Sequence, residues 1–260
     1  MQQQTVTYNC TSYDANTKRL APFRVIKYIF NYSTSSEDKE LLDYFISEGT
    51  KLAQQVNPKG ANDSSKKREY EKILNNCIAG VISEYLWKEY LNSEKECVSE
   101  TELLDMSAQI DLKVLSNNKK IEVRSSFPRN GIDFALCSGS FEFDVIGMYS
   151  NDYKPNEVQK DFYVRALFHL EKVRDWVNPK GQTVPIIAKL LDKIKQPNFE
   201  VFLTGGATWE MMIDDKIAKN KSFIPDDERS IERISSPTTY RVVPFSKALD
   251  TLDIFELISK

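Results

Sequence analysis

The stretch QIDLKVLSNNKKIEVRSS, from Gln109 to Ser126, decides the expected fold of this 260-residue chain. Its two halves, IDLKVL and KKIEVRS, alternate apolar and polar residues on either side of a polar turn, which is the pattern of a β-hairpin. Because successive side chains of a strand point to opposite faces, Asp111 and Lys113 are expected to meet Glu122 and Arg124 on one face. Two carboxylates from neighbouring strands, with a cation beside them, suit the binding of Mg²⁺ and the hydrolysis of a phosphodiester.

This hairpin resembles the catalytic motif of the PD-(D/E)XK nuclease superfamily, the fold of many restriction endonucleases, in which an Asp is followed on the next strand by Glu-X-Lys. Asp111 and Glu122 match the two acids, and Arg124 stands where Lys is usual. Arginine cannot act as a base at neutral pH, although it can hold a phosphate. Lys113, two residues after Asp111, is the alternative source of an ammonium group.

The resemblance extends to a preceding helix, expected over residues 65–91, in which the family carries a small residue followed by a Glu that can reach the metal. Gly80 and Glu84 match this pattern, and their spacing places them on one helix face. The resemblance therefore implies that Asp111 and Glu122 bind Mg²⁺ and that Glu84 supports the metal. The alternative is a surface Glu84 paired with Lys88, four residues further on.

Two other segments offer competing sites. Glu142 and Asp144 share a face of an expected strand, with Asp133 upstream, and form the reserve acidic pair. Gly205 and Gly206 precede a helix start capped by Thr208, where backbone amides could approach a phosphate; the alternative is a simple strand-to-helix turn. No Lys follows these glycines as in a P-loop.

The distribution of charged residues indicates whether the chain binds nucleic acid. The formal net charge is −3 and the pI about 5.5, which is not typical of a nonspecific nucleic-acid binder. Basic residues nevertheless lie beside the hairpin and on a later strand, and we expect weak phosphate contacts from Lys119, Lys120, Arg129 and Arg165. The expected partner is double-stranded DNA, and the oligomeric state, including a homodimer, is left open.

The cysteines and the histidine limit the kinds of active site that this chain can form. The four cysteines are far apart and contain no CxxC, which argues against a zinc site and predicts free thiols in a reducing compartment. The single histidine, His169, cannot supply the paired histidines of common zinc hydrolases, and we interpret it as structural. Carboxylates are therefore expected to carry any catalysis.

The order of expected elements predicts an α/β (α+β) fold with a central mixed β-sheet flanked by helices. Strands are expected over 23–32, 161–168, 198–204 and 239–245, and one or two more over 131–150. Further helices are expected over 37–55, 170–177, 184–195 and 246–258, and a long loop over 216–239. We expect a single domain, 1–260, with an N-terminal extension (1–64), a nuclease core (65–210) and a C-terminal loop, strand and helix (211–260).

The leading hypothesis is thus a Mg²⁺-dependent DNA endonuclease similar to type II restriction enzymes. The competing hypothesis is an inactive nuclease-like module that binds nucleic acid or protein, and a third is a nuclease that needs a partner or ligand to become active. No apolar run approaches the length of a membrane span, and the first residues do not resemble a signal peptide, so a cytoplasmic location is expected.

Overall fold

A mixed seven-stranded sheet forms the centre of the fold in the computed structural model, which describes residues 1–10, 22–56, 69–101, 111–128, 130–138, 143–150, 157–170, 172–177, 183–187, 189–222 and 239–260. The strand order is β1-β2-β10-β7-β5-β4-β3. Their bounds are β1 Gln2–Tyr8, β2 Phe23–Phe30, β3 Val98–Glu100, β4 Leu112–Val114, β5 Lys120–Ser126, β7 Phe162–Phe168 and β10 Phe199–Thr208. Strands β5 and β7 pair in parallel, and the other neighbours are antiparallel.

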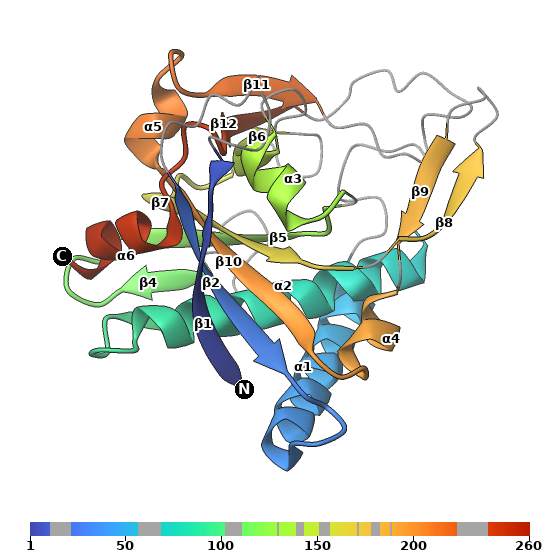
Figure 1. Cartoon of the computed structure of the whole chain (residues 1–260). Helices are drawn as coiled ribbons and strands as arrows, with labels where there is room; N and C mark the ends of the chain where they lie inside the picture. The colour runs from blue at the N-terminus through green and yellow to red at the C-terminus, as the bar shows by residue number, and fades with distance from the viewer. Residues whose placement is uncertain are drawn as a thin grey trace.

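Helices cover one face of this sheet (Figure 1). They are α1 (Ser36–Gln55), α2 (Tyr70–Leu91), α4 (Leu190–Ile194) and α6 (Thr251–Ser259). The main core lies between them and the sheet and is apolar and aromatic. In it, the indole of Trp87 on α2 donates a hydrogen bond of 3.2 Å to the carbonyl oxygen of Arg165 on β7. This bond holds α2 against the middle of the sheet.

The opposite face is covered by two short helices and a small sheet, which enclose a second apolar core. The helices are α3 (Ile132–Cys137) and α5 (Trp209–Ile213). The small sheet has the order β11-β12-β6, with β6 at Asp144–Ser150, β11 at Lys219–Ser222 and β12 at Thr239–Pro244. A separate hairpin is formed by β8 (Lys172–Val177) and β9 (Thr183–Ile187). The architecture is the predicted α+β fold with a mixed sheet between helices.

Several predicted elements are confirmed, because their apolar residues follow the period of the element that forms. Helix α1 begins after Ser35, whose hydroxyl accepts a hydrogen bond from the amide of Asp38. The expected strands at β2, β7 and β12 and the expected helix at α6 are also present. The beginning of the second predicted helix, residues 65–68, lies outside the described part of the chain.

Other element predictions are wrong. Residues 170–177 were expected to be helical and instead form β8, and the helix expected over 184–195 is replaced by β9 followed by the short α4. The predicted strand region 131–150 begins with helix α3, although it also holds the expected strand, β6. The described start of the predicted loop 216–239 contains β11, and residues 223–238 lie outside the described part of the chain. Strand β1 was missed altogether, since most of its side chains are exposed and lack an apolar alternation.

The double glycine does not form the predicted turn. Gly205 and Gly206 lie inside β10, where the register to β7 shifts. Gly205 has φ +75°, and a Cβ on Gly206 would lie 2.3 Å from the carbonyl oxygen of Tyr163. Gly206 also exchanges two backbone hydrogen bonds with Leu249. The glycines therefore serve a bulge and a close backbone approach rather than a phosphate loop.

The prediction of four free thiols is wrong for one pair. Cys10, after β1, and Cys137, at the end of α3, form a disulfide across 127 residues of sequence. Cys77 and Cys97 are buried and remain thiols, as predicted. Sequence spacing could not reveal the bond, because it depends on how α3 packs beside β1.

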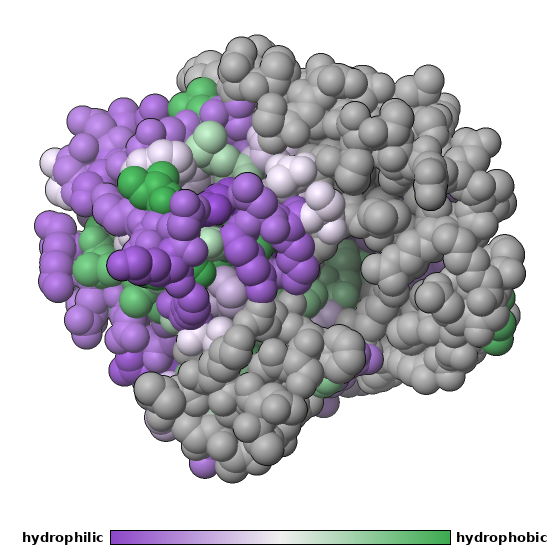
Figure 2. Space-filling model, turned by 90° about the horizontal axis from the view of Figure 1, so that it is seen from above, coloured by the Kyte–Doolittle hydropathy of each residue, from purple (hydrophilic) through white to green (hydrophobic). Residues whose placement is uncertain are grey.

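The surface seen from above is mainly hydrophilic where the structure describes it, with hydrophobic residues scattered among polar ones (Figure 2). None of the helices in the described ranges has the length and apolar character of a membrane span.

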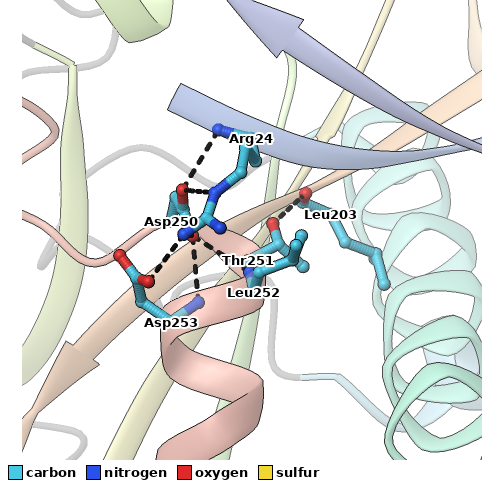
Figure 3. Close-up of polar contacts among 6 residues, drawn as sticks. All are labelled: Arg24, Leu203, Asp250, Thr251, Leu252 and Asp253. Atoms are coloured by element: carbon cyan, nitrogen blue, oxygen red, sulfur yellow. Dashed lines mark hydrogen bonds and ion pairs between the residues drawn. The ribbon is translucent and has the colours of Figure 1, made fainter. Parts of the chain in front are cut away.

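Helix α6 is fastened to β2 through its N-cap (Figure 3). The carboxylate of Asp250 accepts hydrogen bonds from the amides of Leu252 and Asp253 and from the Arg24 guanidinium, at 2.5 and 3.0 Å. The hydroxyl of Thr251 donates to the carbonyl oxygen of Leu203 on β10. One buried carboxylate thus satisfies both the helix end and a cation on the sheet.

We predict that Asp250→Ala lowers the free energy of unfolding by about 2 kcal/mol, because it removes the helix cap and the bidentate ion pair of Asp250 with Arg24. Asp253→Ala is the control: its side chain is 51% exposed, against 5% for Asp250, so its loss should cost no more than about 0.5 kcal/mol. Urea unfolding followed by circular dichroism measures both. Equal costs for the two variants would contradict this account of how α6 is attached.

Candidate active site

The predicted hairpin forms, with β4 and β5 antiparallel, Leu112 opposite Ile121 and Lys113 opposite Lys120. Continuing this register places Asp111 opposite Glu122. Asn118 makes the turn with φ 60°, a conformation that Asn tolerates better than most residues. The apolar face predicted from the alternation is confirmed, since its side chains are buried: Leu112, Val114, Ile121 and Val123.

The two predicted acids are buried at the hairpin. Asp111 is 9% exposed and Glu122 6%. A carboxylate oxygen of Asp111 accepts a 2.7 Å hydrogen bond from the amide of Val123, which fixes the side chain against β5. Burial, together with the charge of Glu122, raises the pKa of Asp111 to about 7. The pair is therefore an acidic site in which one proton is held near neutral pH.

Glu84 joins this pair from α2, as the sequence predicted. Its side chain is half-buried, and burial followed by the charges of Asp111 and Glu122 raises its pKa well above the ordinary value. Lys88 instead makes an ion pair of 3.1 Å with Glu100 on β3, so the alternative pairing of Glu84 with Lys88 is not formed. Three carboxylates from α2, β5 and the residue before β4 thus interact electrostatically.

Two cations neutralise Glu122. The Arg124 guanidinium lies 2.7 Å from one carboxylate oxygen of Glu122, and the ammonium of Lys160 lies 3.3 Å from the other. Arg124 also reaches the carboxylate of Glu157, at 2.8 Å. Burial by itself would lower the pKa of Arg124, but the charges of Glu122 and Glu157 hold it above its ordinary value. Arg124 is thus held between two carboxylates.

Lys160 and Glu157 were missed by the sequence reasoning. They lie in the segment before β7, outside the hairpin motif, and both are almost fully buried. This segment reaches the site because Asp161 makes two hydrogen bonds to the backbone of Lys120, at 2.8 and 2.9 Å, where β5 begins. The only sequence signal was a basic and an acidic residue just before the apolar run FYVRALF.

Lys113, the predicted alternative ammonium, takes no such position. In the sheet its backbone lies opposite Ser99 on β3 and Lys120 on β5. Its side chain forms no ion pair with Asp111 or Glu122 among the residues that the structure describes.

The predicted DNA contacts fall into three groups. Lys119 is exposed at the start of the hairpin's second strand, its ammonium 5.4 Å from the ring centre of Phe162, and Lys120 is half-buried beside it. Arg129 lies outside the described residues. Arg165 is 2% exposed in the middle of β7, so the phosphate contact expected of it stays a prediction and would have to form inside the protein.

The reserve site is not assembled from the residues that can be seen. Glu142 lies outside the described residues, and Asp144 is buried in an ion pair of 2.5 Å with Lys221 on β11. Asp133 is exposed on α3 and lines a separate cavity of about 400 Å³ together with Tyr8, His169 and Glu200. His169, interpreted as structural, is exposed at this cavity.

The donor set can be tested against magnesium. Within the described ranges, no three side chains of the kinds that bind metals converge closely enough to hold an ion by themselves. Mg²⁺ does not require this, because it is commonly bound by one or two carboxylates, waters and substrate phosphates. Asp111 and Glu122 fit that requirement, and a divalent cation would offset the burial and the mutual repulsion that raise the pKa values of Asp111 and Glu84.

Comparisons with known proteins identify no family. The chain is similar to the uncharacterized protein MJECS01 of Methanocaldococcus jannaschii, with 26% identity over 253 residues that cover 86% of this chain and 83% of the relative. No family model and no solved structure matches. The assignment of function therefore depends on the site itself.

We predict that Asp111→Asn stabilises the metal-free protein above neutral pH. The folded protein holds the Asp111 proton up to about pH 7, whereas the unfolded chain releases it near its ordinary value of 3.8, so wild-type stability falls as pH rises between these values. An amide keeps the acceptor for the Val123 amide without the charge.

Thermal unfolding in EDTA should show a higher melting temperature than wild type at about pH 8 and no gain at about pH 4. Asp133→Asn, which changes an exposed carboxylate, is the control and should show neither effect. A lower melting temperature for Asp111→Asn at about pH 8 would mean that Asp111 is a stabilising anion.

Proposed function

We propose that this chain is a Mg²⁺-dependent endonuclease that hydrolyses phosphodiester bonds of double-stranded DNA, in the manner of type II restriction enzymes. The observation that carries the proposal is the position of Lys160. Its ammonium lies 3.3 Å from the carboxylate of Glu122. The hairpin supplies the two acids, Asp111 and Glu122, and Lys160 adds the amine that completes the group.

Each residue has a distinct role in this proposal. Asp111 and Glu122 would hold the metal, which supplies Lewis acidity and an activated water when it is bound, and Glu84 would support it from α2. Lys160 would orient the water or neutralise charge on the phosphate. Arg124 positions Glu122 through their 2.7 Å ion pair and connects it to Glu157.

The competing function is a binding module without catalysis. It is favoured by one observation: both oxygens of Glu122 already contact cations, so the metal would have to compete with Arg124 and Lys160.

Incubating the purified protein with plasmid and phage DNA in Mg²⁺ separates the two functions. Discrete fragments support a sequence-specific endonuclease, random degradation a nonspecific one, and binding without cleavage the module. The proposal also includes double-stranded DNA as the partner, assembly as a homodimer and a cytoplasmic location.

We predict that Lys160→Met reduces the cleavage rate at saturating DNA and Mg²⁺ by about 100-fold or more, because a positioned ammonium is lost from the reacting centre. Lys113→Met is the matched control, since it removes a lysine of the hairpin that forms no ion pair with Asp111 or Glu122 among the described residues, and its rate should stay within about 3-fold of wild type. The reverse result, with Lys113→Met inactive and Lys160→Met active, would overturn the role given to Lys160.

A further inference from the structure

Arg165 is a buried cation that the described residues only partly satisfy. Its side chain lies in the middle of β7 and is 2% exposed. One terminal nitrogen donates to the hydroxyl of Ser126 on β5, and the guanidinium carbon lies 5.0 Å from the ring centre of Phe143. The Nε and the other terminal nitrogen have no hydrogen-bond partner within the described structure. Burying such donors is costly, so the arrangement needs an explanation.

A second guanidinium lies beside it. Arg124 and Arg165 are register partners on the parallel strands β5 and β7, and their side chains therefore leave the same face of the sheet. The Nε of Arg124 is also buried without a partner, and its guanidinium carbon lies 5.3 Å from the ring centre of Tyr149. Two positively charged side chains thus lie beside each other next to aromatic rings of the β6 region. Some of their N–H donors have no hydrogen-bond partner within the described structure.

The nearby acids do not neutralise Arg165. Asp144 attracts it, but the ion pair of Asp144 is with Lys221, and Glu157 is bound to Arg124. Burial and the neighbouring charge of Arg124 lower the pKa of Arg165, with Asp144 opposing that change. The part of the site around Arg124 and Arg165 is therefore rich in positive charge, while the carboxyl groups of Glu84, Asp111 and Glu122 interact at its other side.

We propose that Arg165, together with the Nε of Arg124 and the hydroxyl of Ser126, binds a phosphate oxyanion beside the carboxylates of the site. Guanidinium groups hold phosphate oxygens through paired N–H donors, which are the groups left over here. Arg124 and Ser126 are half-buried, so an anion reaches the subsite from their side, and Arg165 lies behind them. The inference deepens the proposed function, since a phosphate next to the one being cleaved would be its natural occupant.

A purely structural role for Arg165 predicts the opposite change in melting temperature when this residue is replaced. If Arg165 were a fold-stabilising residue, removing it would lower the melting temperature. If it is kept for binding an anion, Arg165→Met removes an uncompensated buried charge and should raise the melting temperature without phosphate, by roughly 2–4 °C.

The test measures melting temperature in EDTA, where no cleavage occurs, with inorganic phosphate or chloride at equal ionic strength. Wild type should be stabilised by phosphate, Ser126→Ala less so, and Arg165→Met no more than a general salt effect allows. Arg241→Met is the matched control: Arg241 lies on β12 of the small sheet and is bound to Asp215, and the phosphate shift of this variant should remain that of wild type.

A second arm replaces phosphate with a dithymidine phosphodiester. Stabilisation by the diester identifies a nucleic-acid phosphate as the occupant, and stabilisation by inorganic phosphate alone identifies a free phosphate. A destabilised Arg165→Met, or a phosphate shift equal to that of wild type in this variant, would overturn the subsite. An Arg165-dependent shift in a protein that cleaves no DNA would refute the nuclease and leave the subsite standing, and cleavage without any phosphate shift would do the reverse.

Discussion

The parallel pairing of β5 with β7 is the constraint on which the candidate site depends. It sets Glu122 beside Tyr163 and Arg124 beside Arg165, although these residues are about 40 positions apart in the sequence. The hydrogen bonds between Asp161 and the backbone of Lys120 fix where the pairing starts. A shift of one residue would turn Arg124 into the apolar core and remove Lys160 from Glu122.

The packing below the sheet makes that register rigid. The carbonyl oxygen of Arg165 accepts hydrogen bonds from the Trp87 indole on α2, at 3.2 Å, and from the Thr204 hydroxyl on β10, at 3.4 Å. Because Trp87 lies one helical turn from Glu84, the same contact sets how far Glu84 can reach toward the acids. Core packing and the geometry of the charged groups are therefore consequences of one arrangement.

How far the sequence predicts this molecule depends on whether a signal is local. The hairpin, its acidic pair and helices α1 and α2 follow from the spacing of apolar and polar residues, whereas Glu84 was singled out by the resemblance of its helix to the nuclease family's pattern. The segment that carries Lys160 has no periodicity of its own, and its contact with Glu122 exists only after β7 has paired with β5. The bond between Cys10 and Cys137 is hidden for the same reason.

The distribution of charge gives the site its chemical character. Glu122 is doubly neutralised, yet on one side of it burial and the neighbouring carboxylates raise the pKa values of Asp111 and Glu84, and on the other Arg165 keeps buried donors without partners among the described residues. A fold selected for stability alone would join such groups to each other, because each uncompensated charge weakens the folded state. Their separation instead suits a ligand that is positive at one end and negative at the other, as a metal-bound phosphate is. Under the proposed function, the cost of burying these groups would be offset when the metal and the phosphate are both bound.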